Sequence, residues 1–156
     1  MNANLVTTLE TSNALKDLGV NIKSMFYWSN YYYSYDPYQG GWESNAYGKL
    51  ELTYDLPPHS EQEHPKDLVF YSAFTAGELG EMLPARLRME DHDRWLYTSP
   101  LKDNSAWDIR YKAWIHLDNQ APWQKTTNWI QAKTEAEARA LMLIYLIKNK
   151  LMELPK

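Results

Sequence analysis

The sequence contains no cysteine among its 156 residues. This absence excludes disulfides, thiol nucleophiles, cysteine-ligated zinc and iron–sulfur clusters. Long apolar runs are missing too, because the most apolar stretch, residues 140–147, ends at Lys148, far short of the roughly 20 residues that span a bilayer. The N-terminus also lacks the basic and apolar regions of a signal peptide. We therefore expect no membrane span and a cytoplasmic protein.

Several motifs of enzyme chemistry are absent as well. The chain has no Gly-x-Gly-x-x-Gly, no Gly-x-x-x-x-Gly-Lys-Ser/Thr, no His-Glu-x-x-His and no Gly-x-Ser-x-Gly. Histidines and carboxylates do not occur at a recognisable metal-ligand spacing. We therefore expect no cofactor and no metal ion, and the sequence points to no catalytic residue.

Length and charge indicate one globular domain over residues 1–156. The apolar fraction is 44% and the formal net charge is −4. Residues 1–65 contain three Lys and eight acidic residues, whereas the remainder contains thirteen basic and twelve acidic residues. This balance argues against nucleic acid as a partner, because phosphate backbones require an excess of positive charge.

Three segments carry the Thr-x-x-Glu spacing that begins a helix with a capping box. The three pairs are Thr7 with Glu10, Thr75 with Glu78, and Thr134 with Glu137. The first helix is expected to end at Gly19, with Val20 packing back on Leu15 as in a Schellman ending. Pro84 ends the second helix, and the third runs to about Leu151.

Alternating and β-favouring segments lie between these helices. Aromatic residues over 22–35, a turn, and alternation over 49–55 predict a long aromatic β-hairpin. Further strands are predicted at 68–71, 86–89, 94–98, 109–117 and 128–132. Since helices and strands do not alternate as βαβ units, we predict an α+β fold with a mostly antiparallel sheet packed by three helices.

The C-terminal helix is apolar nearly all round. We expect five of its residues to be mostly buried: Leu141, Leu143, Ile144, Tyr145 and Ile147. Such a helix must be covered on more than one side. A two-fold homodimer would provide this cover, and the alternative is cover within one chain by the first helix and residues 107–129.

Aromatic residues gather in the first hairpin, where eight of the twelve Tyr lie between Tyr27 and Tyr54. Alternation along a strand places only one face in the core, and aromatic residues are enriched at interfaces. Five residues are candidates for a binding surface: Tyr27, Tyr31, Tyr33, Tyr35 and Trp42. The alternative is an ordinary sheet whose aromatics are covered by helices and loops of the same chain.

Histidines next to acidic residues suggest a different class of function. His59 and His64 lie near Glu61 and Glu63 in a loop rich in proline, and His92 lies between Asp91 and Asp93 in a turn. A small hydrolase or phosphoesterase could use such groups. Solvated loop and turn residues are the alternative interpretation.

Three stretches of the chain resemble a known group of proteins. The first stretch is Leu15-Lys16-Asp17-Leu18-Gly19-Val20. It is followed by residues 73–84, AFTAGELGEMLP, and by residues 134–146, TEAEARALMLIYL. In this order they look like small proteins of phages, prophages and mobile elements in gut Bacteroidota. The resemblance implies an accessory protein and no catalytic residue. The leading hypothesis is therefore a non-enzymatic protein that binds a host protein or a small ligand through its aromatic surface.

Overall fold

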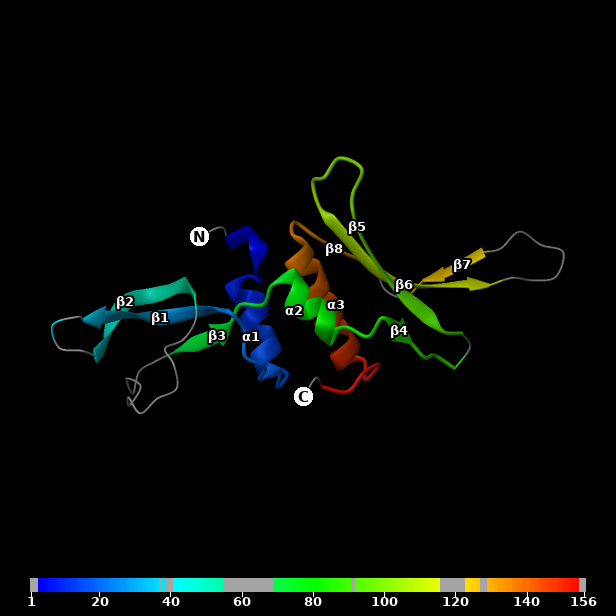
Figure 1. Ribbon diagram of the computed structural model, residues 1–156. Helices are drawn as coiled ribbons and strands as arrows, with labels where there is room; N and C mark the ends of the chain where they lie inside the picture. The colour runs from blue at the N-terminus through cyan, green and yellow to red at the C-terminus, as the bar shows by residue number, and fades with distance from the viewer. Residues whose placement is uncertain are drawn as a thin grey trace.

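Helices occupy the middle of the molecule, and β-strands extend from both sides of them (Figure 1). The computed structural model describes residues 3–36, 38, 41–54, 69–90, 92–115, 123–126 and 129–154, and describes only the backbone of residues 3, 32–36, 41–47, 114–115 and 123–125. The elements are η1 (Ala3–Leu5), α1 (Leu9–Asp17), β1 (Phe26–Asp36), β2 (Gly41–Tyr54), β3 (Phe70–Ser72), α2 (Ala76–Met82), β4 (Arg86–Leu87), β5 (Arg94–Pro100), β6 (Trp107–Ile115), β7 (Trp123–Thr126), β8 (Ile130–Ala132) and α3 (Glu135–Lys148). This order confirms the predicted α+β class.

The strands form two antiparallel sheets. The first has the order β2-β1-β3, and the second has the order β4-β5-β6-β7, with β8 also paired to β6. The predicted antiparallel pairing is confirmed, and it is divided between two sheets. The break follows from α2, which separates β3 from β4 and packs on α3, so that the chain starts a new sheet on the other side of the helices.

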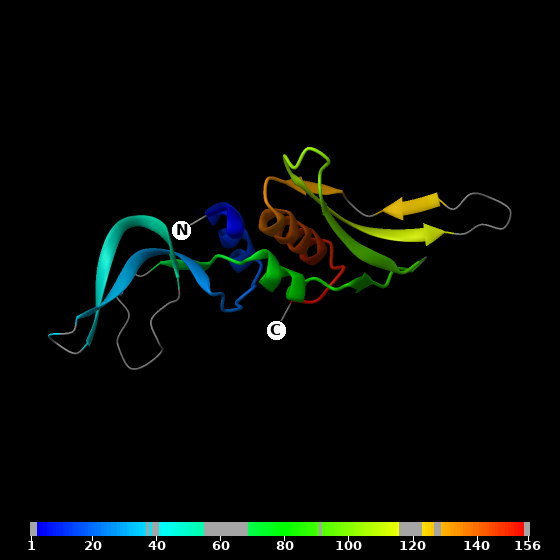
Figure 2. The ribbon, with the colours of Figure 1, turned by 45° about the horizontal axis from the view of Figure 1, so that its top comes forward.

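The first sheet contains a large irregularity. Ser29 pairs with Glu51, but Tyr31 pairs with Ala46, so that residues 47–50 of β2 face a single residue of β1. Gly48 lies in this bulge with φ of +75°, a conformation that favours glycine. Strand β2 is consequently much longer than the predicted segment 49–55, and it arches away from β1 (Figure 2).

Helix α1 ends as the sequence predicts but begins one residue later. Gly19 has φ of +87°, and the amide of Val20 donates to the carbonyl of Leu15 at 3.0 Å, which confirms the Schellman ending. The N-cap is Thr8, whose hydroxyl accepts from the amide of Thr11, so the predicted Thr7 cap was wrong. Thr7 is instead fully buried, where its hydroxyl accepts from the amide of Phe74.

The other two helices begin at the predicted caps. Thr75 and Glu78 form a complete capping box at α2. Thr134 also caps α3 by accepting from the amide of Glu137. The carboxylate of Glu137, however, accepts from the amide of Thr8 at 3.1 Å, so the acidic residue of α3 completes the cap of α1.

The core lies between the three helices and the inner face of the second sheet. Its fully or nearly fully buried side chains form one cluster: Leu15, Val20, Phe74, Leu79, Leu83, Leu87, Ile109, Tyr111, Ala136, Ala138, Ala140, Met142, Leu143 and Leu146. Helix α3 contacts α1, α2, β6 and β8. Within the described residues, no helix is long and apolar enough to cross a membrane.

The contacts of α3 decide how its apolar surface is covered. Leu143 is fully buried, as predicted, whereas Leu141, Ile144, Tyr145 and Ile147 are only partly buried. The helices and the second sheet of the same chain therefore provide the cover for α3. The apolar surface of α3 no longer argues for a homodimer, which stays a prediction.

Candidate functional site

The second sheet has one face against α3 and an opposite face that no described helix covers (Figure 2). We call this opposite side the open face. The pairing register and the ring contacts place these described residues on it: Arg86, Trp95, Tyr97, Ser99, Asp108, Arg110, Lys112, Thr126, Trp129 and Gln131.

Strand β6 creates the open face by strict alternation. Ile109, Tyr111 and Ala113 point to the core and are fully buried or nearly so. Arg110 and Lys112 point the other way, because successive side chains of a strand alternate between its two faces. The same alternation on β5 places Trp95 and Tyr97 opposite these two cations, since Trp95 pairs with Lys112 and Tyr97 with Arg110.

Among the side chains that the structure describes, each exposed ring of the open face is in contact with a cation. The Nζ atom of Lys112 lies 4.7 Å from the centroid of the Tyr97 ring. The guanidinium carbon of Arg110 lies 5.2 Å from the centroid of the Trp129 ring, and that of Arg86 lies 5.9 Å from the Trp95 ring. Such cation–π contacts hold both partners in place at the surface.

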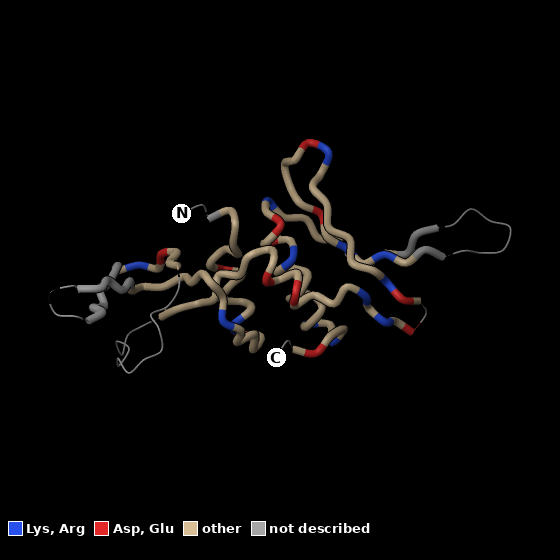
Figure 3. The backbone as a smooth tube through the Cα atoms, viewed as in Figure 1, with Lys and Arg blue, Asp and Glu red and all other residues tan. Residues whose placement is uncertain are grey.

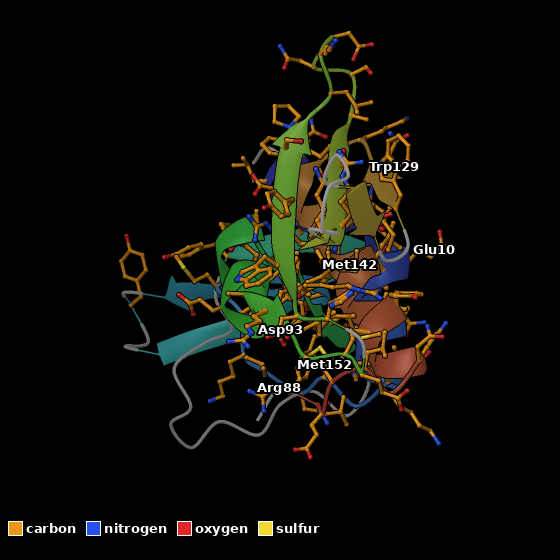
Figure 4. All side chains as sticks on the ribbon, turned by 90° about the vertical axis from the view of Figure 1, so that its right-hand side faces the viewer. Glu10, Arg88, Asp93, Trp129, Met142 and Met152 are labelled. Atoms are coloured by element: carbon orange, nitrogen blue, oxygen red, sulfur yellow. The ribbon has the colours of Figure 1, made fainter. Side chains whose placement is uncertain are left out.

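The three rings remain accessible in spite of these contacts. Trp95 is 48% exposed, Tyr97 is 41% exposed and Trp129 is 57% exposed. Figure 4 looks at this side of the molecule, with α3 behind the strands, and shows Trp129 at one end and Arg88 and Asp93 at the other. Large aromatic residues that are grouped and exposed in this way mark interaction surfaces.

Two carboxylates fix arginines of the open face. Asp108 is only 5% exposed, and its Oδ2 lies 3.1 Å from Nη2 of Arg110. At the other end, the guanidinium of Arg86 donates to the carboxylate of Asp93 and lowers the pKa of that carboxyl. Both arginines are thereby oriented, whereas Lys112 has its contact with the Tyr97 ring.

Charge distinguishes the two sheets sharply. The strands of the first sheet contain one basic residue, Lys49, and three acidic residues. The strands of the second sheet contain five basic residues and a single acidic one, Asp108. Figure 3 shows this excess of Lys and Arg along the second sheet. Two of these five, Arg94 and Lys125, pair with core-facing residues of the neighbouring strands, so the open face itself has Arg86, Arg110 and Lys112 against Asp108.

The predicted binding residues of the first hairpin do not form an exposed group among the described side chains. Tyr27 is 5% exposed and packs edge-on against Phe70, with ring centroids 6.0 Å apart, so its prediction as a surface residue was wrong. Ser29, which lies on the same face of β1, is fully buried as well. Tyr31 is half-buried. The side chains of Tyr33, Tyr35 and Trp42 lie outside the described residues, although the backbone of Tyr35 pairs with that of Trp42.

The histidine alternative gains no support. His59 and His64 lie outside the described residues, and His92 is exposed in the turn before β5. In the described part of the chain, no three His, Asp or Glu residues are placed to bind a metal ion. The hydrolase function stays a prediction.

A cleft of about 530 Å³ lies beside the first turn of α3, between η1, α2 and the start of β6. Its charged lining residues are Lys133 and Glu135. The carboxylate of Glu135 forms an ion pair with Arg139, whose Nε donates to it at 2.8 Å. Two hydroxyl groups also line the cleft. That of Ser105 donates to the carboxylate of Asp103 at 2.7 Å within an exposed turn, and that of Thr134 caps α3. No His of the described residues lies beside either hydroxyl to act as a base.

Comparison with protein-family models, with curated proteins and with solved structures finds no match to this chain. The function therefore has to be argued from the residues of the open face. One signal in the sequence could have indicated it: Trp95-x-Tyr97 and Arg110-x-Lys112 each repeat a residue type with the period of a strand.

Proposed function

We propose that this protein is a non-enzymatic accessory protein of a phage or mobile element, and that it binds an anionic polymer through the open face. The resemblance of the α1, α2 and α3 segments supports the accessory context. A single observation carries the binding function: Trp95, Tyr97 and Trp129 are exposed, and a Lys or Arg of the sheet contacts each ring.

The chemistry of this surface favours a ligand that is both extended and negatively charged. Cations on β4 and β6 are spread across the sheet and do not converge on one point, so they fit a chain of anionic groups better than one small anion. The rings between them add contact area at a small cost in side-chain entropy.

Affinity for a generic polyanion tests this proposal. The wild-type protein is loaded on immobilised heparin at low salt and eluted with a salt gradient, beside a variant with Arg86→Gln and Lys112→Gln. We expect retention of the wild type and earlier elution of the variant, because the attraction between exposed charges depends on the number of cations and on salt.

Two control variants locate the effect. Lys49→Gln removes a cation from the first sheet whose side chain is 75% exposed, and it should elute with the wild type. The triple variant Tyr31→Ser, Tyr33→Ser, Tyr35→Ser tests the first hairpin, and it should also be unchanged. Failure of the wild type to bind, or loss of retention in the hairpin variant alone, would contradict the open face as the binding surface.

A further inference from the structure

We infer that the anionic polymer is single-stranded nucleic acid, with its bases stacked on Trp95, Tyr97 and Trp129 and its phosphates near Arg86, Arg110 and Lys112. This inference rests on the proposed function and names its ligand. Aromatic rings that stack bases, together with cations along the backbone path, are the two components of sequence-tolerant single-strand binding.

The positions of the rings suit successive bases of one strand. Trp95 and Tyr97 are two residues apart on β5, which places them about 7 Å apart on the same face. Trp129 lies on the other side of β6 and contacts Arg110, which itself pairs with Tyr97. The three rings therefore form a path across the sheet with Arg110 between the last two.

Exposed ring surface distinguishes nucleic acid from other polyanions. A sulfated polysaccharide or an acidic peptide without aromatic residues would meet the same cations, of which Arg86 and Arg110 also pair with Asp93 and Asp108. Neither ligand offers a planar π-system to the three rings. A base offers a planar π-surface to each ring, and such stacking is worth about tenfold or more in affinity per base. A ligand with bases therefore uses all six side chains, the rings by stacking and the cations by contact with phosphates.

The need for exposed base faces also distinguishes single-stranded nucleic acid from a duplex. In a duplex the faces of the bases are covered by their neighbours in the stack, so they cannot lie on Trp129 or Trp95. The expectation from sequence that nucleic acid is a poor partner depended on the acidic first half of the chain. The exposed rings of the open face lie instead on the second sheet, where basic residues outnumber acidic ones.

Fluorescence anisotropy provides the test, with a labelled thymidine oligonucleotide of about 15 nucleotides, a length in the range that single-strand-binding folds cover. The competitors are the same oligonucleotide unlabelled, its duplex, heparin and poly-glutamate. We expect binding that only the unlabelled single strand displaces efficiently. Intrinsic tryptophan fluorescence of the wild type should be quenched by the oligonucleotide and not by heparin, because a stacked base quenches the indole and heparin has no aromatic ring.

Variants assign the effect to the rings. Trp129→Ala should weaken binding about tenfold, whereas Trp129→Phe, which keeps a ring, should lose far less. Tyr54→Ala is the matched control, since Tyr54 is 59% exposed on the first sheet and packs on Phe26, and it should bind as the wild type does. Lys112→Gln should reduce the slope of log K against log salt by about 0.7. Circular dichroism checks that each variant is folded, and Trp95→Ala replaces Trp129→Ala if the latter is not.

The possible failures are distinguishable. If heparin or the duplex competes as well as the single strand, and ring variants bind normally while Lys112→Gln does not, the inference is overturned but the proposed function stands. If neither the oligonucleotide nor heparin binds the wild type, both are overturned.

Discussion

The two sheets use aromatic residues and cations in different ways. In the first sheet the cation comes from outside: Lys16 of α1 lies 5.2 Å from the Phe70 ring and 4.8 Å from the Tyr71 ring and donates to the carbonyl of Phe70. In the second sheet the cations come from β4 and β6 themselves. The difference in exposure is one of degree: Phe70 is 36% exposed and Tyr71 is half-buried, whereas the three rings of the open face are 41 to 57% exposed. Aromatic density alone therefore does not locate a binding surface.

The largest difference between the sheets should appear in stability. Leu143→Ala removes a fully buried side chain of α3 beneath the second sheet and should lower the free energy of unfolding by about 2 to 5 kcal/mol, through lost transfer energy and a cavity. Leu52→Ala, at a half-buried site of the first sheet, should cost about 1 kcal/mol. Urea unfolding measures both. Equal losses would mean that the first sheet shares the core.

The connection between α1 and α3 should contribute less. Glu137 accepts from the amide of Thr8 and from the hydroxyls of Thr8 and Thr11, and Glu137→Gln should cost about 1 to 3 kcal/mol because these are hydrogen bonds to a charged group. Glu135→Gln is the matched control in the same turn. It removes only the pair with Arg139 and should cost about 0.3 to 0.5 kcal/mol in the same urea assay. A larger effect of Glu135→Gln would refute the bridging role of Glu137.

The smallest expected effect concerns Tyr111 of β6, whose hydroxyl donates to the carbonyl of Pro84 at 2.6 Å. Tyr111→Phe should cost about 0.5 to 1.5 kcal/mol at neutral pH. Burial raises the pKa of this phenol above its ordinary value of 10.0, because the charged form is disfavoured in the core. The stability that depends on the neutral phenol is therefore complete below pH 10.0 and is lost as pH rises above it.

Urea unfolding of the wild type and of Tyr111→Phe at a series of pH values above neutrality checks this prediction. The wild type should lose more stability than Tyr111→Phe between about pH 10 and 11.5. In this range the phenol of Tyr111 ionises in the unfolded chain but stays neutral in the folded one, which favours unfolding, and the Phe variant lacks this group. Parallel losses would show that other groups determine the alkaline limit.

Local signals along the chain predicted much of the secondary structure. The capping box of Thr75 and Glu78 and the glycine ending of α1 depend on residues within one turn, so the sequence contains all of their parts. The Thr134 cap of α3 also depends only on residues within one turn. The start of α1 could not be predicted in this way, because the carboxylate that supports Thr8 comes from Glu137, on the far side of the fold.

The candidate site likewise combines features that the sequence predicts with features that depend on tertiary packing. Sequence alone determined the α+β class, the alternation of β6 and the presence of aromatic strands, since each follows from residue type and period. It did not determine which aromatic residues stay exposed. Tyr27 is buried and Trp129 is open because the rest of the fold packs on one face of each sheet. A strand such as β1, with aromatic residues on both faces, does not encode in its own pattern which face that will be. Only the tertiary structure decided that the rings of the second sheet meet solvent beside their cations.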